Sequence, residues 1–81
     1  WLNVQYQIFI GRRLFMIGKN ISTLLYKQHK TQVWLSQQCG VTKGHINQII
    51  SGKANPSIKL LLKISKALSV NVDEIIDNNF E

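Results

Sequence analysis

The sequence predicts an all-α domain of five short helices, with a possible β-strand extension at its N-terminus. Aliphatic residues recur three and four positions apart from Ile17 to Ile76, which is the spacing of helices that bury one face. Thr, Ser or Asn precedes the later segments and glycine follows two of them, as at helix ends. With 81 residues, the chain is about half as long as the roughly 150 residues expected of a domain, so it forms one domain.

Residues 1–16 differ from the rest because they contain a stretch, residues 2–10, in which every second residue is apolar. Leu, Val, Tyr or Ile occupies every second position from residue 2 to residue 10, which is the period of a β-strand. A lone strand needs a second strand to pair with, most simply the same segment of another subunit. Alternatively, residues 1–15 are upstream sequence and the natural domain begins at Met16, the only methionine. We therefore expect an extension over 1–16, the helical domain over 17–78 and an acidic tail over 79–81.

The first two helices are predicted from one apolar face each. The inward residues of the first helix are Ile17, Ile21, Leu24 and Leu25, with Gln28 as a possible addition. Polar His29 and Lys30 end this helix. Thr31 is a good N-cap for the second helix, which turns Leu35 and Cys39 inward and ends at Gly40.

The last three helices follow the same pattern. Thr42 caps the third helix, Ser57 caps the fourth, and Asn71 with Glu74 makes a capping-box pattern for a short fifth helix. Gly52 ends the third helix, and a loop follows it. The expected core residues of these helices are Ile46, Ile49, Ile50, Leu60, Leu61, Ile64, Ala67, Leu68, Ile75 and Ile76.

The charge distribution favours a polyanionic ligand. Ten Lys and Arg against four Asp and Glu give a net charge of +6, and no acid occurs before Asp73. Such a surface attracts nucleic acid, anionic lipid or an acidic protein. Alternatively, the excess of basic residues only keeps the protein soluble. No apolar run approaches the roughly 20 residues that span a bilayer, and no secretory signal opens the chain. We expect a cytoplasmic protein that does not bind a membrane.

Enzymatic and metal-dependent functions are not expected. Cys39 is the only cysteine, so neither an intrachain disulfide nor a cysteine-based zinc site can form, and a reducing compartment is favoured. His29 and His45 are the only histidines, and all the acids lie in the last nine residues. We therefore predict no catalytic residue, no metal and no cofactor.

The second and third predicted helices have the spacing of a helix-turn-helix. They are joined by Gly40-Val41-Thr42, in which the glycine permits a sharp reversal. With its isoleucines inside, the third helix turns an acid-free face outward. The residues of this face are Lys43, Gly44, Asn47, Gln48 and Ser51. Lys can donate to guanine or phosphate, and Asn or Gln can pair with adenine, whereas the alternative is an ordinary solvated face.

At these residues the chain resembles the Cro/repressor-type (XRE-like) helix-turn-helix family, over roughly Ile17 to Ile76. The resemblance is carried by Thr31-Gln32, Gly40-Val41-Thr42, Ile46, Gly52-Lys53, Asn55-Pro56-Ser57, and the segments Leu61–Leu68 and Val72–Ile76. It implies a five-helix domain without catalytic activity that binds double-stranded DNA as a homodimer on roughly palindromic operators. It further implies base-edge roles for Lys43, Gly44, Asn47 and Gln48, with His45 flanking. The implied phosphate contacts are Gln32, Thr42, Lys53 and Asn55.

Several residues depart from the family pattern. Gly44 stands where a long base-reading side chain is common. Either the backbone approaches DNA closely at this position, or the protein makes fewer contacts with the bases there. Leu25 and Ile50 replace an Arg and a Glu that often form a buried ion pair, and we expect both to be buried and in contact. Trp34 stands where a charged surface residue is usual, and it either docks the predicted N-terminal strand or packs on its own helices.

The sequence thus supports two functions from different classes. The first is a sequence-specific DNA-binding transcriptional regulator, most simply a repressor, that uses the helix at 43–51. The second is a protein-interaction module on the same fold, such as an antitoxin or anti-regulator, for which residues 2–10 or Trp34 would be the contact site.

Overall fold

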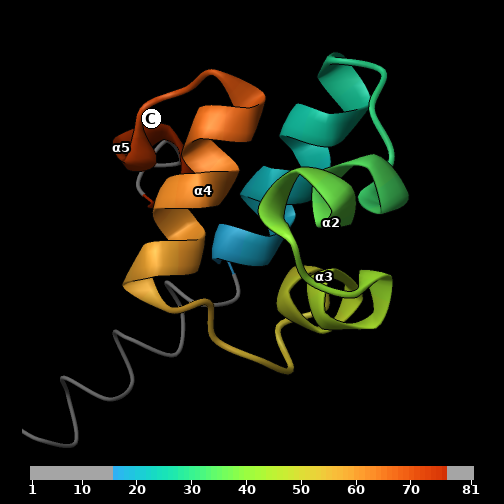
Figure 1. Cartoon of the computed structure of the whole chain (residues 1–81). Coiled ribbons are helices and arrows are strands. Elements are labelled where there is room, and N and C mark those ends of the chain that lie inside the picture. The colour runs from blue at the N-terminus through green and yellow to red at the C-terminus, as the bar shows by residue number, and fades with distance from the viewer. Residues whose placement is uncertain (1–15, 77–81) are drawn as a thin grey trace, which may run out of the picture.

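The computed structural model describes residues 16–76 and confirms the all-α prediction (Figure 1). An N-terminal helix covers residues 16–27. It is followed by α2 (Gln32–Cys39), α3 (Lys43–Ile50), α4 (Ile58–Leu68) and α5 (Val72–Ile76). No strand occurs in this part of the chain. The expected strand at 2–10 and the expected acidic tail at 79–81 lie outside the described residues.

Hydroxyl side chains begin three of the helices, as the sequence predicts. The Oγ atoms of Thr31, Thr42 and Ser57 accept hydrogen bonds from backbone N–H groups three residues later, at 3.0, 3.1 and 3.1 Å. The backbone N–H of Asn71 donates to Glu74 Oε2 at 3.2 Å, which is one half of the expected capping box. These bonds satisfy donors that a helix leaves open in its first turn, so they fix where each helix begins.

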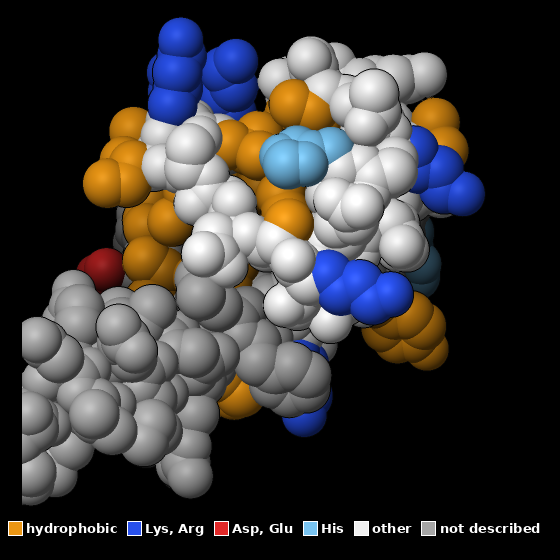
Figure 2. All heavy atoms as spheres, turned by 90° about the horizontal axis from the view of Figure 1, so that it is seen from below, with side chains coloured by type: hydrophobic (Ala, Val, Ile, Leu, Met, Phe, Trp, Pro, Cys, Tyr) orange, Lys and Arg blue, Asp and Glu red, His pale blue; other side chains and the backbone are white. Residues whose placement is uncertain are grey.

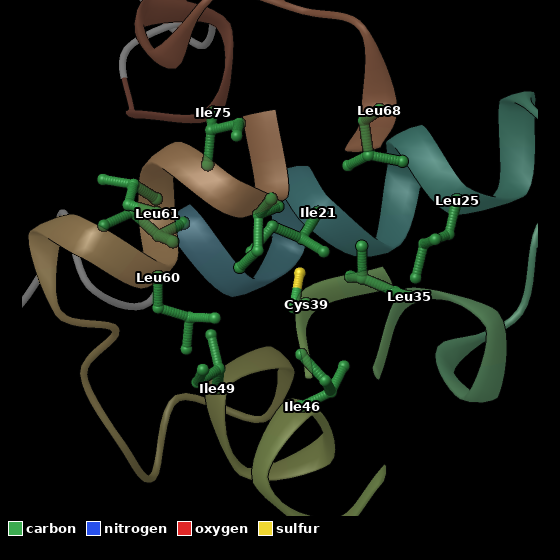
Figure 3. Packing of buried hydrophobic residues seen from close by; sticks show 12 residues of the cluster. Ile21, Leu25, Leu35, Cys39, Ile46, Ile49, Leu60, Leu61, Leu68 and Ile75 are labelled. Atoms are coloured by element: carbon green, nitrogen blue, oxygen red, sulfur yellow. The ribbon is translucent and has the colours of Figure 1, made fainter. Parts of the chain in front are cut away.

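The core lies between the N-terminal helix, α2, α3 and α4, and α5 closes one end of it (Figures 1 and 3). The fully buried residues include Ile21, Leu35, Ile46, Ile49, Ile64, Leu68 and Ile75. Leu24, Ile50, Ala67 and Ile76, all expected in the core, are only partly buried at its edge. The aliphatic spacing therefore identified the inward faces correctly and overstated burial at their margins.

Two amide side chains tie the first helix to the end of the domain that α5 occupies. Asn20 is 3% exposed, and its Nδ2 donates to the carbonyl of Ile75. Gln28 Nε2 donates to the carbonyl of Leu68 at 2.8 Å. Both carbonyls belong to the last turns of helices, where no intrahelical partner is available, so the amides replace the missing donors.

Asn20→Ala should lower the free energy of unfolding by about 1–3 kcal/mol, because it leaves a buried carbonyl without this donor. Gln28→Ala, at a half-buried site, should lower it by about 0.5–1.5 kcal/mol. Urea unfolding followed by circular dichroism measures both changes. Equal stability of the Asn20→Ala variant and the wild type would show that water replaces the amide without loss.

The N-terminal helix packs closely on the end of α3 at Gly18. A Cβ atom built at this position would lie within 2.5 Å of the carbonyl oxygens of Ile49 and Ile50. A glycine is therefore required here by the approach of two backbones. Leu25 is buried as expected, whereas Ile50 is only partly buried. The Ile50 carbonyl lies against Gly18, and Gly18 is about two helical turns from Leu25 in the N-terminal helix. The predicted full burial of Ile50 is wrong.

Candidate nucleic-acid interface

The turn between α2 and α3 is held by two backbone hydrogen bonds and one packed side chain. Gly40 has φ 72°, in the left-handed region that glycine adopts freely, and its N–H donates to the carbonyl of Ser36. The N–H of Val41 donates to the same carbonyl at 3.1 Å, and the Val41 side chain packs against the core. The structure thus confirms the predicted helix-turn-helix, and it holds α3 at one end of the molecule (Figure 1).

The expected base-edge residues share the outward face of α3. Burial of Ile46 and Ile49 turns the opposite side of the helix toward solvent. Lys43, Gly44, Asn47 and Gln48 are exposed there, and His45 is half-buried at the flank. These side chains offer an ammonium group and two amides, the donor and acceptor types that read base edges in the major groove.

The expected phosphate contacts border this face on two sides. Gln32, the first residue of α2, is half-buried, and its Oε1 accepts from Asn47 Nδ2 at 3.3 Å. Thr42 is exposed at the start of α3, with its hydroxyl accepting from the His45 N–H. Lys53 and Asn55 are exposed in the loop that follows α3. The structure therefore brings the α2 start, the α3 start and this loop to one end of the domain.

The backbone carbonyl of Gln48 anchors that loop, a feature the sequence did not reveal. It accepts hydrogen bonds from the Lys53 and Ala54 N–H groups at 2.9 and 3.2 Å and from the Ser51 hydroxyl at 3.2 Å. Ala54 also packs against the core. Lys53 is consequently held beside the end of α3, although no periodicity or motif marks these bonds.

The electrostatics of this end are positive. Figure 2 views the molecule from the side on which α3 lies, and shows Lys side chains around a polar surface, with acidic colour only at the margin. Among the described residues, the acids Asp73 and Glu74 lie in the first turn of α5. The α3 face therefore meets an anion without local repulsion.

Within 16–76, no group of three or more His, Cys, Asp or Glu side chains could hold a metal ion. Burial raises the pKa of the Cys39 thiol, and the positive charge of Lys63 partly opposes this shift. None of the helices in the described part is long and apolar enough to cross a membrane.

Trp34 packs on its own helices. It is half-buried against the core, and the Lys30 ammonium lies 4.9 Å from the centroid of its ring, within cation–π range. The structure thus shows packing of Trp34 at the rim of the core, and docking of the N-terminal strand on this residue stays a prediction. Residues 2–10, the alternative contact site for a partner, lie outside the described residues.

Comparisons with known proteins agree with this geometry. A family model described as helix-turn-helix matches residues 23–75. A search of curated protein sequences found no match. A similar solved structure is the restriction-modification controller protein C.AhdI from Aeromonas hydrophila, with a TM-score of 0.73 and 22% sequence identity over 76% of this chain and 94% of that chain. At this identity the likeness concerns the fold.

Proposed function

Because the chain belongs to the Cro/repressor-type helix-turn-helix family, whose members are DNA-binding transcription regulators, we propose that it represses transcription from a palindromic operator. The observation that carries this proposal is the exposed, acid-free face of α3, with Lys43, Asn47 and Gln48 side by side. The role needs no catalytic residue and no cofactor. We further propose a cytoplasmic location, where the operator would be.

The proposed contacts divide into two kinds. Lys43, Gly44, Asn47 and Gln48 face the bases in the major groove, with His45 at the edge. Gln32, Thr42, Lys53 and Asn55 contact the phosphates on either side. Phosphate contacts fix the position of α3 on the duplex and base contacts supply sequence preference, so the two sets have separable effects on binding.

Selection from a random duplex library tests this function. A palindromic operator should emerge, with half-sites about one helical turn, roughly 10 base pairs, apart. Titration should then show an affinity for it at least about 10³-fold above that for a scrambled duplex. Weak and equal binding to all sequences would instead favour the protein-interaction module.

Operator binding by two α3 helices requires a dimer, and we propose that α4 and α5 form its interface. Ile58 and Leu62 lie one turn apart on α4 and are 77% and 51% exposed. Figure 2 shows hydrophobic side chains gathered on the side where α4 lies. Val72 and Ile76 of α5 are partly buried, whereas Ile75 is fully buried inside the protomer and is not part of this surface. Exposed apolar clusters of this kind mark association surfaces.

Leu62→Asp should convert the dimer to a monomer at micromolar concentration, because it buries a charge in an apolar interface. Sedimentation equilibrium measures the mass. Val33→Asp is the matched control, since Val33 is 45% exposed on α2 and should leave the dimer intact. If Leu62→Asp stays dimeric and deletion of residues 1–15 gives a monomer, the interface belongs to the N-terminal segment instead.

A further inference from the structure

A cleft between α2 and α4 lies outside the face proposed for DNA. Its cavity has a volume of about 240 Å³ and is lined by Gln38 near the end of α2 and by Lys63, Lys66 and Ala67 of α4. We call these four residues the α2–α4 cleft. Because α4 runs away from the α3 end of the molecule (Figure 1), Lys66 stands about 12 Å along the helix axis from the first residue of α4.

The polar groups of the α2–α4 cleft have no partner within the described part of the chain. Gln38, Lys63 and Lys66 are all exposed, and their side chains make no hydrogen bond or ion pair there. The acids of this part, Asp73 and Glu74, lie in the first turn of α5 and do not line the cleft. Two ammonium groups therefore border the cleft without a counter-charge.

The spacing of the two lysines selects an anionic ligand. Lys63 and Lys66 are three positions apart on α4, so their side chains lie on one side of the helix. Like charges at this spacing repel each other and destabilise the helix. A carboxylate bound between them removes this repulsion and is attracted by both ammonium groups, whereas a neutral or basic ligand does neither.

The size of the cleft and its amide group favour a segment of a protein over a free small molecule. Pockets that enclose small molecules usually have volumes of about 300–1,000 Å³, which is more than this cavity offers. The Gln38 side chain supplies both an N–H donor and a C=O acceptor, as a peptide bond does, so the two groups are complementary.

An extended peptide also has the right spacing for the two lysines. Alternate side chains of an extended segment project to the same side, about 6.5–7 Å apart. Side chains three positions apart on a helix are neighbours at about 5–6 Å, and both lysines have long, flexible stems. Two acidic residues separated by one residue therefore match Lys63 and Lys66.

We propose that the α2–α4 cleft binds an extended acidic segment of a partner protein, in which two carboxylates separated by one residue pair with Lys63 and Lys66 and a backbone amide pairs with Gln38. This inference goes beyond the proposed DNA-binding function and does not depend on it. It gives the protein a second surface, so that an operator on α3 and a partner protein in the cleft are bound at the same time.

A titration of the ¹⁵N-labelled protein with synthetic peptides, followed by NMR, tests this inference. The probe is a short peptide that has two glutamates separated by one serine and blocked, uncharged ends. The control peptide has glutamine in place of both glutamates. The amide signals of Gln38, Lys63, Lys66 and Ala67 should shift with the glutamate peptide and stay in place with the glutamine peptide.

Two double variants separate the cleft from the overall positive charge. Lys63→Gln with Lys66→Gln should weaken binding of the glutamate peptide by about tenfold, as expected from the loss of two exposed ion pairs. Lys19→Gln with Lys27→Gln is the matched control, because it removes the same charge from exposed positions of the N-terminal helix. It should keep the peptide affinity within about twofold, since distant charges are screened by salt. Circular dichroism confirms that both variants are folded.

An equal loss of peptide affinity in the two double variants would overturn the inference, because net charge would then drive binding. Shifts confined to α3 would overturn it as well, since the peptide would then occupy the face proposed for DNA. Equal binding of the glutamine peptide, or no shift of the cleft signals at peptide concentrations up to the millimolar range, would also overturn it.

Discussion

Gly18→Ala is expected to lower the free energy of unfolding by about 2–3 kcal/mol, as overpacked sites do. The added Cβ would lie within 2.5 Å of the carbonyl oxygens of Ile49 and Ile50, and backbone atoms cannot rotate out of the way as a side chain can. Either α3 or the N-terminal helix must move. Alanine favours a helix by about 1 kcal/mol over glycine, and this gain does not offset the clash. Urea or thermal unfolding measures the loss.

Gly44→Ala is the matched control, because it makes the same chemical change in open space. The nearest atom to a Cβ at Gly44 is Thr42 Oγ1 at 3.9 Å, an ordinary contact distance. This variant should be more stable than the wild type by about 0.5–1 kcal/mol. A Gly18→Ala variant that gains stability as Gly44→Ala does would contradict the close packing of α3 on the first helix.

The same control decides between the two explanations of Gly44. If the backbone of α3 approaches DNA closely at this position, Gly44→Ala should weaken operator binding although it stabilises the free protein. If the protein instead makes few base contacts at this position, the operator affinity of Gly44→Ala should stay within about twofold of the wild type. Titration of the selected operator distinguishes the two cases, because the unfolding experiment reports only on the free protein.

DNA affinity should fall steeply with salt concentration. Each phosphate neutralised by a lysine contributes about −0.9 to the slope of log affinity against log salt concentration. Lys53 of two protomers would neutralise two phosphates and give a slope near −1.8, or roughly a tenfold loss between 50 and 200 mM salt. Further lysines at the rim would steepen this dependence.

Lys53→Ala should weaken binding to every sequence about equally and flatten the slope by about 0.9 for each protomer. Lys66→Ala is its matched control. It removes the same charge from the last turn of α4, a helix that runs from the α3 end of the molecule toward the opposite end (Figure 1). It should leave the slope nearly unchanged. Equal effects of the two variants would mean that net charge, rather than contact, drives binding.

Features that depend on neighbouring residues were predictable from the sequence. Thr31, Thr42 and Ser57 cap helices through hydroxyl groups that accept from N–H groups just three residues later in the chain, so both partners lie within one short stretch of sequence. The buried isoleucines of α3 follow from helical spacing alone, and they determine which side chains point outward. The composition of the candidate interface could therefore be predicted before its shape was known.

Features that join distant parts of the chain could not be predicted in this way. The Asn20 bond to Ile75 spans 55 residues, and nothing near Asn20 indicates its acceptor. The close approach at Gly18 depends on how α3 crosses the first helix. His29 and Ser69 adopt φ 58°, a conformation usual for glycine, so no glycine marked those helix ends. Tertiary packing decides each of these features.

The central claim is that the exposed face of α3 supplies sequence preference, and one affinity ratio tests it most directly. The ratio of operator affinity to scrambled-duplex affinity is measured for the wild type and for the variant carrying Asn47→Ala and Gln48→Ala. The wild-type ratio should be at least about 10³, and each lost bidentate contact should reduce it by about 5- to 150-fold. Affinity for the scrambled duplex should change little, because phosphate contacts remain. A ratio near one in the wild type, or an unchanged ratio in the double variant, would contradict the claim.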